Sequence, residues 1–153
     1  MPKCLSFLFL PFFLLFSAGA VANAKCQQEI EGARKIAKAL SERRLQETAW
    51  VYGFANPAFP TLIKVGWTKD VESRRLQLSG AAVPSEFTVI AKARVPLPTR
   101  VEKILHCIYA DVRVSPGKEF FRLPQKEFST LLDRLNSQPI EKVIDILVEE
   151  SKR

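Results

Sequence analysis

The sequence lacks a long apolar run outside its N-terminus, has three cysteines and one histidine, and contains no internal repeat or low-complexity tract. The N-terminal run, Leu5–Phe16, is interrupted by Pro11 and is shorter than the roughly 20 apolar residues that a membrane-spanning helix needs. With Lys3 before it and small residues ending at Ala24 after it, the segment has the layout of a secretory signal peptide. We therefore expect cleavage after Ala24 and export to the periplasm or the medium. An uncleaved membrane anchor is the alternative.

Removing 24 of the 153 residues leaves 129, which suits one domain with a modest core. Cys4 would leave with the signal peptide, so Cys26 and Cys107 would remain. An oxidising compartment would permit a disulfide between these two. Burial of Cys107 as a small apolar residue on a helix is an equally good interpretation.

The basic residues of the chain are concentrated in its middle. Between Lys64 and Lys126 there are 12 basic and 6 acidic residues, a net charge of +6. The flanking segments cancel each other, with 6 basic and 4 acidic residues over 25–63 and 4 basic and 6 acidic over 127–153. An excess gathered in one segment indicates a polyanionic partner, nucleic acid first and an anionic membrane surface second.

Apolar periodicity and turn residues predict an alternation of strands and helices. The expected elements are a helix over 27–46, strands over 49–55 and 61–67, a helix over 70–79, a strand over 86–95, a helix over 99–112, a short extended piece within 115–123, and helices over 124–136 and 139–151. The first two strands should form an antiparallel hairpin, because only a short turn joins them. We expect Thr68 or Asp70 to cap the second helix and Thr99 to cap the third. This order predicts an α+β fold, with a small three-stranded antiparallel or mixed sheet flanked by helices and preceded by one helix.

Short motifs follow one another along these elements. They are Trp50-Val51-Tyr52 on the first strand, Lys64-Val65-Gly66 on the second, Arg74 on the next helix, Glu102 with His106 one turn later, and Glu119-Phe120-Phe121. In this order and spacing they resemble the GIY-YIG nuclease superfamily, in its phage-type Orf172 DNA-binding branch. The resemblance covers residues 49–131. It implies a GIY-YIG-like nuclease or DNA-binding domain there, after a signal peptide (1–24) and an N-terminal helix (25–48), and before a C-terminal helical extension (132–153).

The resemblance also implies roles for individual side chains in phosphodiester hydrolysis. Tyr52 would orient or deprotonate the attacking water, and Glu102 would bind a divalent metal, Mg²⁺ or Mn²⁺. Lys64 and Arg74 would hold the scissile phosphate. A lysine inside a strand needs a carboxylate partner or an open cleft, because an unpaired buried ammonium is costly. Arg74 and Arg75 cannot both point into one cleft, because adjacent helical positions point about 100° apart. Counted from Gly66, Arg74 holds the family's arginine position, so the resemblance favours it as the phosphate clamp.

For the other candidate residues, a purely structural role is an alternative to the functional one. His106 would be a base or a second metal ligand, or else a packed histidine. Glu119 would be a partner of Lys64 or Arg74. Lys69, Arg75 and Lys118 are candidate contacts to the substrate, although Arg75 also reads as a solvated neighbour of Arg74.

The sequence therefore predicts a metal-dependent endonuclease that cleaves DNA. The first alternative is a DNA-binding module that does not cut, since Lys64 replaces the tyrosine of the second motif. The second alternative is an exported basic protein that binds anionic surface polymers. No protein partner can be inferred from the sequence.

Overall fold

The computed structural model of the protein describes residues 18–41 and 47–153. Most of the predicted signal peptide, residues 1–17, lies outside the described residues. Its cleavage and the export that it implies stay predictions. Within the described ranges, none of the helices combines the length and the apolar character that crossing a bilayer requires.

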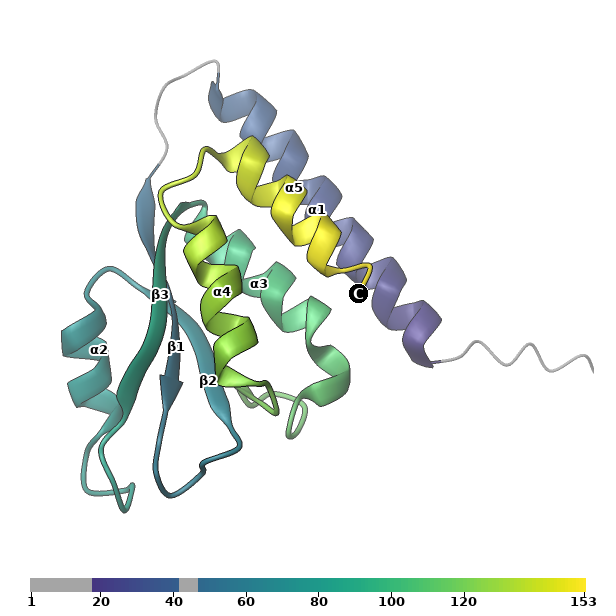
Figure 1. The fold of residues 1–153 in the computed structure, drawn as a ribbon. Coiled ribbons are helices and arrows are strands. Elements are labelled where there is room, and N and C mark those ends of the chain that lie inside the picture. The colour runs from purple at the N-terminus through teal and green to yellow at the C-terminus, as the bar shows by residue number, and fades with distance from the viewer. Residues whose placement is uncertain (1–17, 42–46) are drawn as a thin grey trace, which may run out of the picture.

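The described elements follow the predicted order closely. They are α1 (Ala18–Ser41), β1 (Thr48–Ala55), β2 (Ile63–Thr68), α2 (Val71–Leu78), β3 (Thr88–Pro96), α3 (Pro98–Ile108), the short 3-10 helix η1 (Ala110–Val112), β4 (Phe120–Phe121), α4 (Gln125–Leu135) and α5 (Ile140–Glu150). Figure 1 shows α2 on one side of the sheet and α3 and α4 on the other, with α1 and α5 side by side in an outer layer. The α+β class with a helix before the sheet is confirmed, and the extended piece expected within 115–123 contains a short fourth strand.

The sheet is antiparallel throughout, with the strand order β3-β1-β2-β4. The predicted hairpin of β1 and β2 is present, and it places Tyr52 opposite Gly66. Side chains alternate along the central strand β1. Val51 belongs to the large core beneath the helices, whereas Tyr52 and Phe54 belong to a smaller cluster beside α2. One strand thus contributes to both layers.

Two helix starts show which capping predictions hold. Asp70 is the N-cap of α2, as expected, and its side chain accepts a hydrogen bond from the Ser73 N–H at 2.9 Å. The prediction that Thr99 caps α3 is wrong: the helix begins at Pro98, after Leu97 in the left-handed region with φ 50°. Proline suits the first helical position because its φ is already helical and its missing N–H would have no partner there.

Helix α1 packs against α3 at the two cysteines. Cys26 lies in the large core with 4% of its surface exposed, and the side chain of Cys107 packs against that core. Burial, followed by the hydrogen bond to Cys26, raises the pKa of Cys107 to about 12. Both side chains are thiols in the structure, so α1 is held to α3 here by packing and hydrogen bonding.

The buried residues also show which part of the chain carries the fold. Every residue that the structure describes as buried lies between Cys26 and Leu147. A chain running from Lys25 to Arg153 therefore keeps the whole described core, and the experiments below use it.

Candidate functional site

Tyr52 lies in the middle of β1, with its phenol against the backbone of Gly66 on β2. Only 1% of Tyr52 is exposed, and the Nε of Arg74 on α2 donates to its hydroxyl over 3.5 Å. Burial raises the pKa of Tyr52 more than the hydrogen bond and charge of Arg74 lower it. The phenol therefore keeps its proton at neutral pH and lies between β2 and an arginine.

Gly66 is the residue that allows this placement. A Cβ built at Gly66 would lie 2.5 Å from the hydroxyl oxygen of Tyr52, closer than packed atoms approach. We expect Gly66→Ala to displace Tyr52 and to lower the free energy of unfolding by about 1–3 kcal/mol. Thermal or urea unfolding measures this loss. Gly32→Ala is the control: an added Cβ there meets nothing within 4 Å, and alanine should stabilise a helix interior by about 0.5–1 kcal/mol. Equal stability of the two variants would contradict the proposed packing.

Lys64 on β2 is buried, with 8% of its surface exposed. Its ammonium donates to the Glu119 carboxylate over 2.6 Å and lies 5.3 Å from the centre of the Phe120 ring. Glu119 is thus the carboxylate partner that was expected for a lysine inside a strand as the alternative to an open cleft. Burial would raise the pKa of Glu119, but the hydrogen bond and charge of Lys64 outweigh it and hold that pKa below its usual range. The two side chains therefore form an ion pair at neutral pH.

Along the outer edge of β2, the backbone groups of the strand find hydrogen-bond partners in the short strand β4, in the Glu119 backbone and in two side chains of α3. The short β4 pairs with the first two residues of β2 only. Beyond them, the Glu119 carbonyl accepts from the Val65 N–H at 3.0 Å, and the His106 Nε2 lies 3.0 Å from the Val65 carbonyl. Further along, the Trp67 N–H donates to the Glu102 side chain. Glu119, His106 and Glu102 thus stand in a row along one sheet edge.

His106 takes a defined tautomer in this row. Since its Nε2 faces a carbonyl, that nitrogen carries the proton and donates it, which leaves Nδ1 as an acceptor. Burial lowers the pKa of His106 more than the contact with Val65 raises it, so the ring is neutral at neutral pH. The ring also packs against Phe121, with centroids 5.1 Å apart. The packed interpretation of His106 therefore has contacts to support it.

Glu102 is the most strongly shifted carboxylate of the site. Burial raises its pKa to about 7, with a further contribution from the charge of Glu119, against the opposing effects of the Trp67 N–H and of Lys64. Such a site favours added positive charge. Within residues 18–41 and 47–153, no group of three or more His, Cys, Asp or Glu side chains is arranged so that it could hold a metal ion by itself. A cation held at Glu102 would therefore complete its coordination with water and phosphate oxygens, as Mg²⁺ commonly does.

All of these residues lie within one family match. The T5orf172 domain family matches residues 49–136, which is more than half of the 153 residues. The chain belongs to the T5orf172 domain family. No curated protein and no solved structure is matched by it. The T5orf172 domain runs from β1 to the end of α4, so α1 and α5 lie outside it. This membership is compatible with a nuclease-like or DNA-binding module.

Within the T5orf172 domain, Arg75 is placed differently from Arg74. Its guanidinium donates to the Glu72 carboxylate at 2.6 Å, to Glu86 at 3.2 Å and to the Phe87 carbonyl at 3.0 Å. Its side chain is only 18% exposed. These contacts tie α2 to the segment before β3. Arg75 was expected as a solvated neighbour or a substrate contact, and the structure gives it a bridging position.

The two lysines proposed as substrate contacts, Lys69 and Lys118, lie outside the row of residues along the edge of β2. Lys69 is paired with Glu47 at 2.7 Å, and both side chains are 72% exposed. Lys118 directly precedes Glu119, and its backbone carbonyl accepts a hydrogen bond from Arg113. Neither lysine belongs to the row along β2, although Lys118 is next to it in the chain.

A cluster that sequence reasoning missed lies on the same side of the sheet as Tyr52. The Lys92 ammonium is 4.9 Å and the Arg94 guanidinium 6.0 Å from the ring of Trp50. The register pairs Tyr52 with Lys92 and Trp50 with Arg94, which puts all four on one face. The signal was present in the sequence, because two basic residues alternate within the expected strand 86–95. An aromatic ring flanked by cations suits single-stranded nucleic acid.

Proposed function

We propose that this T5orf172 domain is a metal-dependent endonuclease of the GIY-YIG type that hydrolyses DNA phosphodiester bonds. The observation that carries the proposal is the gathering of Tyr52, Lys64, Arg74, Glu102 and Glu119 around one strand, β2. Phosphodiester hydrolysis needs cations around the phosphate and a group that handles the attacking water. This gathering offers both kinds of group.

Lys64 and Arg74 would bind the phosphate on which the attack occurs. Among the described residues, the Arg74 side chain makes only long hydrogen bonds, 3.5 Å to the Tyr52 hydroxyl and 3.4 Å to Gln77. A guanidinium held so loosely keeps its planar fork for two phosphate oxygens. Lys64 would act as a point charge, and its pairing with Glu119 fixes the direction of the ammonium.

Glu102 would hold Mg²⁺ or Mn²⁺. Such an ion, when bound, would neutralise charge that develops on the phosphate. Glu119 adds negative charge nearby without being a required ligand, since it is paired with Lys64. Tyr52, protonated at neutral pH, would orient the attacking water by hydrogen bonding, and His106 would hold α3 in place along the edge of β2.

One observation favours the alternative of a DNA-binding module that does not cut. The Tyr52 side chain is almost completely covered, and a group that orients water must be reached by water. Incubation of supercoiled plasmid with the chain 25–153 and Mg²⁺ or Mn²⁺, against EDTA, decides between the two. Nicking that EDTA stops supports the endonuclease; binding without nicking supports the module.

Either form of the proposal predicts binding through phosphates. If the basic middle of the domain neutralises about six phosphates, affinity for duplex DNA should fall by at least two orders of magnitude between about 50 and 200 mM salt. Fluorescence anisotropy with a labelled duplex measures this. A chloride-to-glutamate exchange at constant cation concentration controls for anion effects. An affinity that does not change with salt would contradict nucleic-acid binding altogether.

A further inference from the structure

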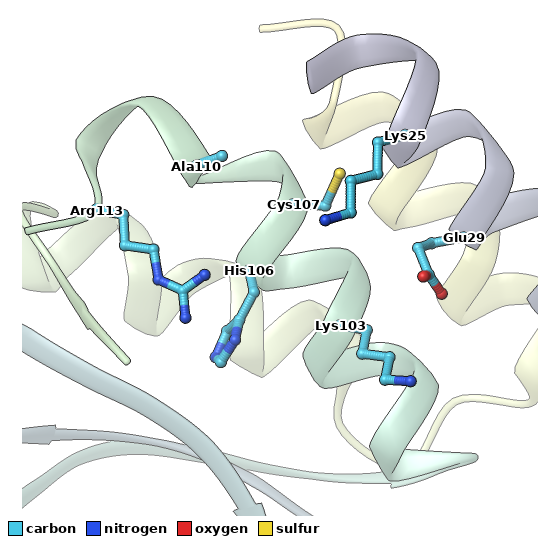
Figure 2. Close-up of a pocket in the computed structure, with 7 residues that line it drawn as sticks. All are labelled: Lys25, Glu29, Lys103, His106, Cys107, Ala110 and Arg113. Atoms are coloured by element: carbon cyan, nitrogen blue, oxygen red, sulfur yellow. The ribbon is translucent and has the colours of Figure 1, made fainter. Parts of the chain in front are cut away.

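A pocket of about 330 Å³ opens between α1 and α3, on the other side of His106 from the sheet. Its volume lies at the lower end of the range of ligand sites, about 300–1,000 Å³. The pocket is lined by Lys25, Glu29, Lys103, His106, Cys107, Ala110 and Arg113. Figure 2 shows these side chains coming from α1, from α3 and from the segment that follows α3.

The charged side chains that line this pocket are mainly basic, and its two lysines form no ion pairs within the described residues. Among the described residues, no carboxylate forms an ion pair with Lys25 or Lys103. Glu29, the acidic residue of the lining, forms an ion pair with Arg100, with a distance of 3.4 Å between the guanidinium nitrogen and the carboxylate oxygen. The pocket therefore presents two ammonium groups that form no ion pair with a carboxylate of the described residues.

Arg113 adds a guanidinium whose orientation is fixed. Its Nε donates to the Lys118 carbonyl, and its Cζ lies 5.5 Å from the centre of the Phe121 ring. Neither contact uses the two terminal nitrogens, which carry the donors that bind phosphate oxygens in pairs. Figure 2 shows the guanidinium directed toward the His106 side of the pocket.

The pocket adjoins the candidate site without being part of it. His106 lines the pocket and also contacts the edge of β2. Lys103 follows Glu102 on α3, so the two side chains point in directions about 100° apart, one toward the pocket and one toward β2. Lys25 comes from α1, which lies outside the T5orf172 domain.

We propose that the pocket between α1 and α3 binds a backbone phosphate of the DNA strand, beside the phosphate that Lys64 and Arg74 hold. The inference rests on the proposed function for the DNA itself, but not on cleavage. Phosphate is the anion that two ammonium groups and a guanidinium fork suit. In this arrangement α1 extends the DNA-binding surface beyond the T5orf172 domain, and His106 separates the two phosphate positions.

The test compares two double variants of equal net charge. Lys25→Gln with Lys103→Gln removes both ammonium groups of the pocket. Lys35→Gln with Lys142→Gln removes two exposed lysines, on α1 and α5, that do not line it. All four residues are exposed, so both variants should unfold at the temperature of the unaltered chain. Duplex affinity of the pocket variant should fall about tenfold and its salt slope should become shallower by about 1, with little change in the control.

A second measurement locates the contact on the DNA. Single phosphates of the duplex are replaced in turn by uncharged methylphosphonates. We expect one replacement to weaken binding of the unaltered chain and of the control variant, but not of the pocket variant, which has already lost that contact.

Equal affinity losses in the two double variants, or the same methylphosphonate pattern in both, would overturn the pocket assignment while leaving the proposed function intact. Duplex affinity of the pocket variant equal to that of the unaltered chain would also overturn it. Failure of the unaltered chain to bind DNA at all would overturn both proposals, whereas binding without cleavage would overturn only the endonuclease.

Discussion

Replacing Glu102 with glutamine is expected to lower metal-dependent DNA cleavage roughly a thousandfold or more. An amide is a poor ligand for a hard cation such as Mg²⁺, so the variant should lose the metal. DNA binding should be retained or strengthened, because a negative charge is removed from a site that faces phosphate. A cleavage time course at pH 8 with Mn²⁺ or Mg²⁺, together with a binding titration in EDTA, measures the two effects separately.

The same substitution should leave the fold intact. Glutamine keeps an oxygen that can accept from the Trp67 N–H, so the edge of β2 stays closed. The pKa of Glu102 is raised from 4.5 to about 7, so its contribution to stability is complete below the usual pKa and is lost as pH rises through about 7. At pH 8 the uncharged variant should therefore be at least as stable as the unaltered chain. Thermal unfolding checks this, and Asp133→Asn, at an exposed position on α4, is the matched control for activity. Cleavage by Glu102→Gln at the unaltered rate would contradict a metal at this position.

The local structure could be predicted because its causes are local. Alternating aromatic and β-branched residues identified β1 and β2, and the short turn between them identified the hairpin. The Asp70 cap followed from its position before a helix. Thr99 was a wrong choice of cap because Leu97 adopts a left-handed conformation, which lets Pro98 start the helix directly after it. Pro98 is itself a signal for the earlier start, because proline is common at the first helical position.

The site could be predicted only in part, because much of it depends on contacts between distant segments. The sequence required a carboxylate partner or an open cleft for Lys64 and named Glu119, 55 residues away, as a partner of Lys64 or Arg74; the structure pairs Glu119 with Lys64. It did not indicate that α3 lies along β2 so that Glu102 and His106 complete the strand edge. The pocket between α1 and α3 was equally hidden, since it depends on how an amphipathic helix before the domain packs onto it.

Arg74 and Arg75 are adjacent in the chain, yet their contacts predict opposite effects on replacement by alanine. In the part of the chain that the structure describes, the Arg74 side chain makes only long hydrogen bonds, with Tyr52 and Gln77, so few favourable interactions of the fold depend on it. Arg75 joins Glu72 on α2 to Glu86 and to the backbone just before β3. Removal of Arg75 leaves the Phe87 carbonyl without this donor and leaves two carboxylates without their counter-charge.

We therefore expect Arg74→Ala to lower kcat/KM for plasmid cleavage by roughly a hundredfold or more, with an unchanged Tm, because it removes a cation from the transition-state phosphate. Arg75→Ala should lower Tm by several degrees and cut normally well below that temperature. Circular dichroism melts and cleavage rates measured on the same preparations separate the two effects. Arg74→Lys adds a further check, since an ammonium keeps the charge without the planar fork and should recover only part of the activity. Equal losses of cleavage in both folded alanine variants, or a larger loss for Arg75→Ala, would show that the phosphate is bound on the other side of α2.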